Sequence, residues 1–281
     1  MRSSTENIYQ EKVNQVIDYI SANLHQPLQL DVIAERICVS RRQLLRIMRS
    51  ALDESLYAYM ARQRMERAIM YMQTEEMTLA ELAARVGYDN PQSFSKAFKK
   101  QFSISPKTYI NELRNRLQKY VKNSGDGCEG LPFEVCEEED IDLVYIRIIG
   151  RYGDENPYET AWSNLMKYLN EKQLLTVSTR FIGLSFDDPN VTNPTQCRFY
   201  ACASVNRKVE PAGKFGTIRL RKGKYAVYTL KGKYSSLQEF YNNISVNFVH
   251  TLRYGMAFEE YIHYTKESNN TTTTKIYIPI K

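Results

Sequence analysis

The pattern of apolar positions changes part-way along the chain. Up to about residue 118, apolar residues recur every three or four positions, which is typical of amphipathic helices. The polar, glycine-containing segment KNSGDGCEG follows, and from about residue 132 apolar and polar residues alternate as they do in strands. The pattern predicts an all-α domain over residues 8–118, a linker over 121–131 and an α+β domain over 132–281.

The segment TLAELAARVGYDNPQSFSKAFKKQFSISPKTYINEL, residues 78–113, predicts two helices joined by a sharp turn. Thr78 and Glu81 have the spacing of a capping box, which begins the first helix. Gly87 supplies the left-handed residue of the turn, and Asn90 caps the second helix with Pro91 at its first position. One side of that helix carries Phe94, Ala97, Phe98 and Phe102, and the other carries Gln92, Lys96 and Lys99.

A second pair of helices with the same design is predicted upstream. An opening amphipathic helix carries Val13, Val16, Ile17, Ile20 and Leu24, and the helix LQLDVIAERI follows before the turn CVS. Ser40 and Gln43 have the spacing of a capping box that begins the helix RRQLLRIMRSAL. One side of this helix carries Leu44, Ile47, Met48 and Ala51, and the other carries Arg42, Leu45, Arg46 and Arg49.

Residues 55–73 contain neither Gly nor Pro and predict one continuous helix between the two pairs. Its 19 residues, at about 1.5 Å each, span about 28 Å, near the roughly 34 Å between successive major-groove faces of B-DNA. One chain can thus place both basic helices in adjacent grooves, so we expect a monomer or a weak dimer. We interpret Arg62, Arg64 and Arg67 as solvated or helix-packing residues rather than as base readers.

Charge is distributed unevenly along the chain. Residues 1–120 hold 18 Lys+Arg and 13 Asp+Glu (18 − 13 = +5), whereas the remaining residues hold 20 and 19 (20 − 19 = +1). A helix face that carries an amide and two cations suits a major groove flanked by phosphates. Double-stranded DNA is therefore the expected partner, although the three arginines of the first pair alone would also fit a solvated surface.

The segment from about residue 10 to 118 resembles the DNA-binding domain of the AraC family of bacterial transcription regulators. The resemblance is carried by LDVIAERICVSRRQLLRIM, by RQRMERA and by LAELAARVGYDNPQSFSKAFKKQFSISPKTY. It implies a promoter or operator as the target, with activation or repression by recruiting or blocking RNA polymerase. The DNA-contacting set, which joins the positions matched to the family with the neighbouring cations, is Arg42, Leu45, Arg46, Arg49, Gln92, Ser93, Lys96 and Lys99.

Three positions depart from the AraC pattern. Cys38 stands where the family often has glycine, which predicts a strained first turn. Asp53 and Glu54 replace the usual Gly–apolar pair before the long helix. Leu45 replaces a commonly polar reader and suggests contact with a thymine methyl group.

Two strand–helix–strand–strand units follow one another beyond the linker. The segments LVYIRIIGRY and KYAVYTLKGKY each precede a helical stretch, PYETAWSNLMKYL and SLQEFYNNISVNFV. Two strand candidates come after each helix: RFIGLSFD and QCRFYACASV after the first, AFEEYIHY and TKIYIPI after the second. The repeat predicts an α+β domain whose two sheets meet around a pseudo-twofold cleft.

This half resembles the GyrI-like effector-binding domain through YIRIIGRY, FDDP, CRFYACASV, GKYAVYTLKGKY, AFEEYI and IYIPI. The resemblance implies a small-molecule effector, and Glu259 stands where such domains commonly have a pocket glutamate. Aromatic faces beside a carboxylate favour a cationic or aromatic ligand, whereas Glu260 is expected to face solvent. The expected ligand-binding set is Trp162, Tyr200, Phe240, Tyr241, Phe258, Glu259 and Tyr261, each aromatic of which could instead be ordinary core.

Catalytic chemistry has weaker support in the sequence. Asp187-Asp188-Pro189 has the composition of a turn between strands, although paired carboxylates can also do acid–base work. Some GyrI-like domains are hydrolases, and Glu259 with Tyr261 could act as base and acid on a bound xenobiotic. A ligand-free protein-interaction module is a third alternative. We expect no enzyme activity.

The remaining composition fits a cytoplasmic protein. The five cysteines are Cys38, Cys128, Cys136, Cys197 and Cys202, an odd number without C-x-x-C spacing, so reduced thiols are expected. Three dispersed histidines predict no metal site, and no cofactor is expected. Neither a signal-peptide core nor a run of about 20 apolar residues is found, so no membrane association is expected.

Overall fold

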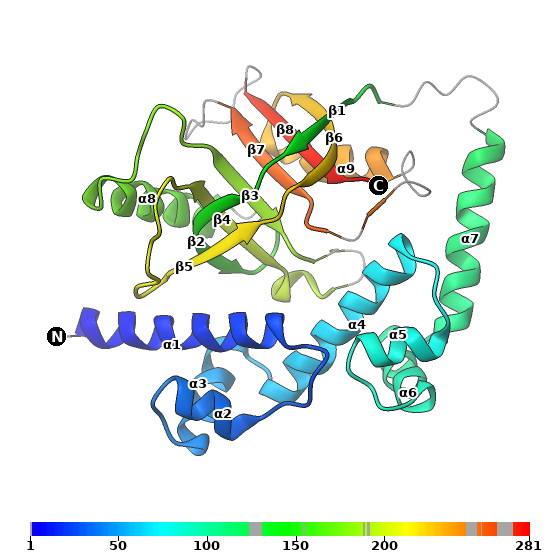
Figure 1. Ribbon diagram of the computed structural model, residues 1–281, viewed down its shortest axis with the longest axis horizontal. Coiled ribbons are helices and arrows are strands. Elements are labelled where there is room, and N and C mark those ends of the chain that lie inside the picture. The colour runs from blue at the N-terminus through cyan, green and yellow to red at the C-terminus, as the bar shows by residue number, and fades with distance from the viewer. Residues whose placement is uncertain are drawn as a thin grey trace. The chain divides into compact units, whose positions relative to one another are not determined.

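The computed structural model describes residues 2–123, 131–153, 155–187, 189, 192–245, 252–253, 255–262 and 272–281 (Figure 1). The chain forms two compact units. The first comprises Met1–Arg116 with Ala212–Lys214, and the second comprises Leu117–Pro211 with Phe215–Lys281. Residues 124–130, which make up most of the expected linker, lie outside the described residues.

The first unit is helical. Its helices are α1 (Arg2–Ala22), α2 (Leu30–Arg36), α3 (Arg41–Leu52), α4 (Leu56–Thr74), α5 (Leu79–Arg85), α6 (Pro91–Phe102) and α7 (Pro106–Asn123), the last of which extends into the second unit. Helices α2 and α3 form one helix–turn–helix, here called the first reader, and α5 and α6 form the second reader. Helix α4 is continuous through its 19 residues, as the absence of Gly and Pro predicts, and it joins the two readers (Figure 1).

Side-chain caps begin the helices at the predicted positions. Thr78 and Glu81 form a complete capping box at α5, and Asn90 Oδ1 accepts the Ser93 N–H over 2.8 Å at α6. Ser40 Oγ accepts the Gln43 N–H over 3.2 Å at α3. In this described part of the chain the Gln43 side chain does not return a bond, so only half of the second predicted box forms.

The turns of the two readers each contain one residue with a positive φ, but the residue type differs. Gly87 has a φ of +83° in the second reader, and Cys38 has a φ of +51° in the first. A β-carbon on Gly87 would lie 2.6 Å from Leu24 O, so glycine is required there for space as well as for φ. Cys38 adopts a left-handed conformation that L side chains disfavour, which confirms the predicted strain of the first turn.

The arginines of α4 are packing residues, as predicted. Arg62 is buried and donates to Glu54 over 3.2 Å and to Glu66 over 3.0 Å. Arg64 and Arg67 donate to backbone carbonyls that lie at the end of α1 or just after it. Glu54, one of the departures from the AraC pattern, thus supplies a carboxylate for a buried arginine.

The second unit is built on one eight-stranded antiparallel sheet. Its strands are β1 (Glu134–Glu138), β2 (Ile141–Ile149), β3 (Phe181–Ser185), β4 (Arg198–Ser204), β5 (Phe215–Leu220), β6 (Gly223–Lys231), β7 (Phe258–Ile262) and β8 (Thr273–Pro279). The helices are α8 (Glu155–Glu171) and α9 (Leu237–Ser245), and the 3₁₀ turns are η1 (Pro194–Gln196) and η2 (Tyr234–Ser236). The strand order is β1-β6-β8-β7-β3-β4-β2-β5, so β7 and β3 are the central pair.

The expected order of elements is present, with two additions. Strand β2, helix α8 and strands β3 and β4 follow one another, and β6, α9, β7 and β8 repeat that order. The sequence pattern did not predict strands β1 and β5, which form the two edges of the sheet. A single continuous sheet replaces the two separate sheets that we expected.

Helices α8 and α9 cover the same face of this sheet. Residues Val144, Ile146 and Ile148 of β2 pack with α8, whereas Ala226 and Tyr228 of β6 pack in the cluster that includes residues of α9. The strand register links these residues across β4, β3, β7 and β8, and registered side chains share a face. We call this side the helical face.

Candidate functional site

Helix α3 presents the predicted cations of the first reader on its exposed side. Arg42, Arg46 and Arg49 are exposed, and Leu45 is half-buried. The opposite side buries Leu44, Ile47, Met48 and Leu52. The sequence pattern placed Ala51 in that apolar stripe, but Ala51 is exposed and the larger Leu52 occupies the buried position.

Helix α6 presents the corresponding surface of the second reader. Its exposed residues are Gln92, Ser93, Lys96 and Lys99. Phe94 and Phe98 are buried beneath them, and their ring centroids lie 5.8 Å apart. The Phe94 ring also meets Tyr88 of the turn at 5.7 Å, which fixes the orientation of α6 on its own unit.

The cations of both readers are available to an anionic partner. Among the residues that the structure describes, none of Arg42, Arg46, Arg49, Lys96 and Lys99 pairs with a carboxylate. Unpaired, exposed cations on two helix faces can neutralise phosphates without first breaking an internal ion pair. This arrangement suits a nucleic acid.

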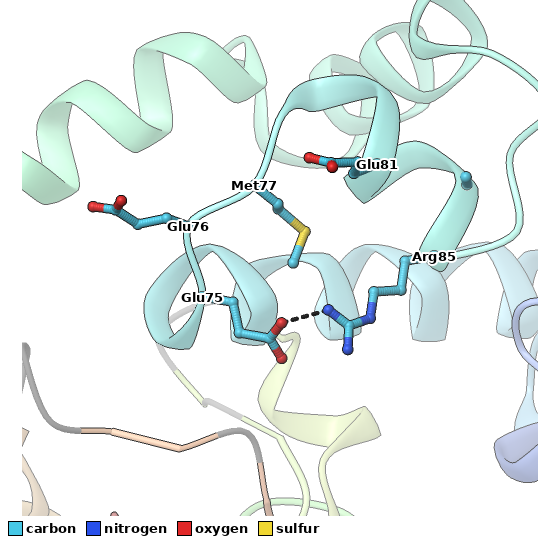
Figure 2. Close-up of a pocket in the computed structure, with 6 residues that line it drawn as sticks. Glu75, Glu76, Met77, Glu81 and Arg85 are labelled. Atoms are coloured by element: carbon cyan, nitrogen blue, oxygen red, sulfur yellow. Dashed lines mark hydrogen bonds and ion pairs between the residues drawn. The ribbon is translucent and has the colours of Figure 1, made fainter. Parts of the chain in front are cut away.

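A hollow of about 550 Å³ lies between the end of α4 and helix α5 (Figure 2). Its lining includes Glu75, Glu76, Glu81 and Arg85, and Figure 2 shows the Glu75 carboxylate paired with the Arg85 guanidinium. Glu81 already accepts hydrogen bonds from Thr78. Three carboxylates against one guanidinium give an acidic lining, which repels phosphate, and none of the expected site residues lies here.

Glu259 lies at the centre of the sheet of the second unit. It pairs across the central strands with Gly183 of β3 and on its other side with Ile276 of β8. This register places its side chain on the helical face, at the seam between the half covered by α8 and the half covered by α9. The residue is only 4 % exposed.

Three hydroxyl groups surround the Glu259 carboxylate. Tyr241 of α9 donates to Oε1 over 3.0 Å, Ser185 of β3 donates to Oε1 over 3.3 Å, and Tyr261 donates to Oε2. All three donors are neutral, and no basic side chain pairs with Glu259 among the described residues. Burial raises the pKa of Glu259, although these hydrogen bonds oppose the rise.

Aromatic rings from both halves adjoin this carboxylate. The Trp162 ring of α8 meets the Tyr261 ring edge-on at 5.5 Å, and the Tyr234 ring also meets it edge-on at 5.3 Å. Phe240 and Tyr241 of α9 pack in the cluster on the other half of the same face. Burial and the charge of Glu259 raise the pKa values of Tyr241 and Tyr261, so both phenols stay protonated donors.

Two expected ligand residues do not join this group. Tyr200 and Phe258 lie in the core on the opposite face of the sheet, where Phe258 stacks on Tyr277 at 4.2 Å. The expectation that Glu260 faces solvent was also wrong. Its side chain points to that opposite face, as predicted, but is mostly buried and pairs with Arg180 at 2.7 Å.

Sequence reasoning missed two residues beside Glu259. Gly183 leaves room for the Tyr261 hydroxyl, because a β-carbon there would lie 2.5 Å from that oxygen. Ser185 supplies one of the three donors. Neither residue type is distinctive in a sequence, and only the pairing of β3 with β7 brings them to the glutamate.

Asp187 has a structural role in this unit. Its carboxylate accepts from the Arg198 guanidinium over 2.7 and 2.9 Å and from the Arg198 N–H over 2.6 Å. Both side chains are buried. Asp188, the second carboxylate of the predicted turn, lies outside the described residues.

Metal-ligand clusters and membrane-spanning helices were also sought. In the described ranges, no three His, Cys, Asp or Glu side chains gather as metal ligands. Every described helix is too short or too polar to cross a lipid bilayer.

Two family descriptions match the chain. Residues 131–281 match the GyrI-like small molecule binding domain, and residues 33–112 match a helix-turn-helix domain. The regulatory protein SoxS of Escherichia coli K12 is 30% identical over 105 residues, which cover 37% of this chain and 98% of SoxS. The HTH-type transcriptional regulator AlkR of Acinetobacter baylyi is 32% identical over 90 residues, 32% of this chain and 29% of AlkR.

A solved structure is similar to part of the chain. The C-terminal domain of AraT, a response regulator from Geobacillus stearothermophilus, is 34% identical and covers 36% of this chain and 84% of that domain, with a TM-score of 0.35. The GyrI-like match covers more than half of the chain, and the helix-turn-helix match covers the second reader and all of the first except Leu30–Val32. The chain therefore belongs to the AraC family of transcriptional regulators and carries a GyrI-like small molecule binding domain.

Proposed function

We propose that this protein is a one-component transcription regulator in which a cationic or aromatic effector binds at Glu259 and changes the binding of promoter DNA by the two readers. The observation that carries the effector assignment is the Glu259 carboxylate, which is buried at the seam of the sheet and, among the residues that the structure describes, receives hydrogen bonds from neutral donors. A buried carboxylate without a counter-charge gains most from a bound cation. The neighbouring rings of Trp162 and Tyr261 add the negative faces that cations prefer.

The ligand site, in this proposal, consists of Glu259 with Trp162, Phe240, Tyr241 and Tyr261, all on the helical face. Ser185 belongs to it as a donor that an effector can displace. Tyr200 and Phe258 are left out because they lie on the other side of the sheet. The two strand–helix–strand–strand units would be related by a pseudo-twofold axis that passes near the β3–β7 pair.

Titration calorimetry of the full chain tests the effector assignment directly. A quaternary ammonium compound with one aromatic ring should bind, and a neutral aromatic compound of the same size should bind at least tenfold more weakly. The same cation should change the affinity of the protein for its operator, because an effector acts only through unequal affinity for two states. Equal binding of the charged and neutral compounds would contradict the assignment.

The DNA-binding part of the proposal assigns base edges to Arg42, Leu45 and Arg46 of the first reader and to Gln92, Ser93 and Lys96 of the second. Arg49 and Lys99 would contact phosphates. The domain division is proposed at residues 8–118, 121–131 and 132–281. A monomer or weak dimer would bind the operator in the cytoplasm, where the chromosome lies, and would act on RNA polymerase there.

Arg46→Ala and Lys99→Ala should change DNA binding in different ways. Loss of Arg46 should weaken operator binding by about 1–3 kcal/mol and reduce the preference for operator over unrelated DNA. Loss of Lys99 should weaken binding to both DNAs alike and lower the salt dependence. Fluorescence anisotropy with both duplexes at several salt concentrations measures these effects.

The exposed lysine Lys167 of α8 provides the control for simple loss of charge. Lys167→Ala should leave binding to both duplexes unchanged. An Arg46→Ala variant that kept its full preference for operator would remove Arg46 from the base-reading set.

We also propose that the chain is not an enzyme, in keeping with relatives that are regulators. A hydrolase would use Glu259 as a base, yet both oxygens of this carboxylate already accept hydrogen bonds from the three hydroxyl groups around it. Incubation of a bound cation with the full chain should return the compound unchanged. Turnover that disappeared in Glu259→Gln would instead favour the hydrolase.

A further inference from the structure

Arg64 of helix α4 lies between the segment that leads into the first reader and the turn of the second reader. Its Nε donates to Leu24 O over 2.8 Å, and its Nη2 donates to Gln26 O over 2.6 Å. Both carbonyls belong to the segment between α1 and α2, which leads into the first reader. On the other side, the guanidinium carbon lies 5.5 Å from the ring centroid of Tyr88, in the turn of the second reader.

Gly87 shows how tightly the second reader fits against this arginine. A β-carbon on Gly87 would lie 2.7 Å from Arg64 Nη2 and 2.6 Å from Leu24 O, the carbonyl that Arg64 holds. The turn of the second reader therefore packs directly on the pair formed by Arg64 and the loop after α1. A displacement of the guanidinium therefore moves the loop after α1 and the turn of the second reader together.

The contact uses properties that belong to arginine and not to lysine. A guanidinium presents several N–H donors in a fixed plane, so two carbonyls can be held at set positions. Its flat face can also stack on an aromatic ring such as Tyr88. The ammonium group of a lysine could form one of these hydrogen bonds, but it could not hold both carbonyls in a fixed plane or stack on the ring.

The neighbouring arginines of α4 have different contacts. Arg62 pairs with Glu54 and Glu66, which lie in the turn after α3 and in α4 itself. Arg67 donates to Ser21 O of α1 over 2.9 Å. These contacts stabilise α4 against the side of the first reader, whereas the contacts of Arg64 join the segment that leads into the first reader to the turn of the second.

We propose that Arg64 is a positioning residue that fixes the distance and angle between the two reading helices and thereby selects the spacing of the two operator half-sites. The proposal rests on the proposed function, in which both readers engage one duplex. Once the first reader is bound, the second finds its half-site at a high effective concentration only if the geometry matches. Because the contact at Arg64 fixes the angle between the readers before DNA binds, the protein binds operators with the matching half-site spacing more tightly than operators with other spacings.

Operators that differ only in spacing test this role. The full-length wild-type chain first selects its site from random duplexes, and footprinting locates the two half-sites. One base pair is then added between them, which moves the second half-site by about 3.4 Å and turns it by about 35°. The wild type should lose at least about tenfold in affinity, whereas Arg64→Met should lose less than about threefold while binding the original operator more weakly.

Arg67→Met is the matched control, since it removes one hydrogen bond of the same helix to a backbone carbonyl. It should keep the wild-type penalty for the added base pair. Arg64→Lys, which keeps the charge, should give a penalty between those of the wild type and Arg64→Met. Circular dichroism and thermal unfolding establish that each variant is folded, and if Arg64→Met is not, the comparison rests on Arg64→Lys.

A penalty in the Arg64 variants equal to that of the wild type would overturn the positioning role, because general destabilisation changes affinity without changing spacing preference. A selected site with one half only would overturn it too, while leaving the regulator assignment intact. Failure of the wild-type chain to select any sequence would instead reject the proposed function, and the inference with it.

Discussion

Glu259→Gln is expected to remove the response to a cationic effector while leaving the protein folded. Glutamine keeps the shape of the side chain and can still accept from Ser185 and Tyr241, but it has no charge. Losing one partner of a buried charge pair costs about 2–5 kcal/mol, so the Kd for the cation should rise by roughly 30-fold or more. Titration calorimetry and operator binding with and without the cation measure both parts of this result.

Glu260→Gln is the matched control, because the neighbouring glutamate points to the opposite face of β7. It weakens the ion pair with Arg180, which retains its contact with Glu138 at 2.7 Å. Cation binding should therefore be unchanged, although the variant should be less stable. If Glu260→Gln reduced cation binding as much as Glu259→Gln, the effector site would not be at the seam.

The pH dependence of stability gives an independent check on Glu259. Because burial raises the pKa of this carboxyl in the folded protein above its ordinary value of 4.5, the folded state holds the proton over a pH range in which the unfolded state has lost it. Its contribution to stability is complete below about 4.5 and is lost as the pH rises through the folded pKa. The stability of Glu259→Gln relative to wild type should thus increase with pH, as urea unfolding at several pH values would measure.

Helix boundaries and reader turns could be predicted from the sequence because their causes are local. A capping box such as Thr78 with Glu81 involves residues three positions apart, and the left-handed turn at Gly87 depends on that residue alone. The strain at Cys38 followed from the same reasoning, since a side chain stands where glycine is usual. In the Ser40–Gln43 capping box, the bond from the Gln43 side chain did not form.

The composition of the seam could be predicted only in part. Alternation along one strand correctly places Glu259 and Tyr261 together and Glu260 opposite. It does not say which face of β4 matches which face of β7, because that depends on the register of β3 between them. Tyr200 therefore entered the expected set although it lies on the opposite face from Glu259, and Gly183 and Ser185 were missed. Phe258 was included although the alternation along its own strand already places it opposite Glu259.

The edge strands were missed for a related reason. An edge strand needs little buried surface, and charged residues protect it from pairing with other chains. The segment EVCEE of β1 has three glutamates in five residues, so its composition does not indicate a strand. This segment forms a strand because its backbone pairs with β6, which its own composition does not indicate.

Asp187→Ala should be among the most destabilising single substitutions in the second unit. Arg198 is only 6 % exposed, and the substitution removes the carboxylate that holds its guanidinium and its N–H. Breaking a buried ion pair from one side costs about 3–5 kcal/mol, because the remaining charge stays buried. Urea unfolding of the full chain, followed by the fluorescence of Trp162, should report the loss in the unit that contains this pair.

Asp142→Ala provides the comparison, because the Asp142–Arg219 pair is about half exposed on both sides. Exposed pairs contribute about 0–1 kcal/mol, so this variant should unfold almost as the wild type does. The double variant Asp187→Leu with Arg198→Met removes both buried charges and should recover much of the loss, since apolar side chains of similar volume avoid the desolvation cost. Equal destabilisation by Asp187→Ala and Asp142→Ala would show that burial does not set the strength of the Asp187–Arg198 pair.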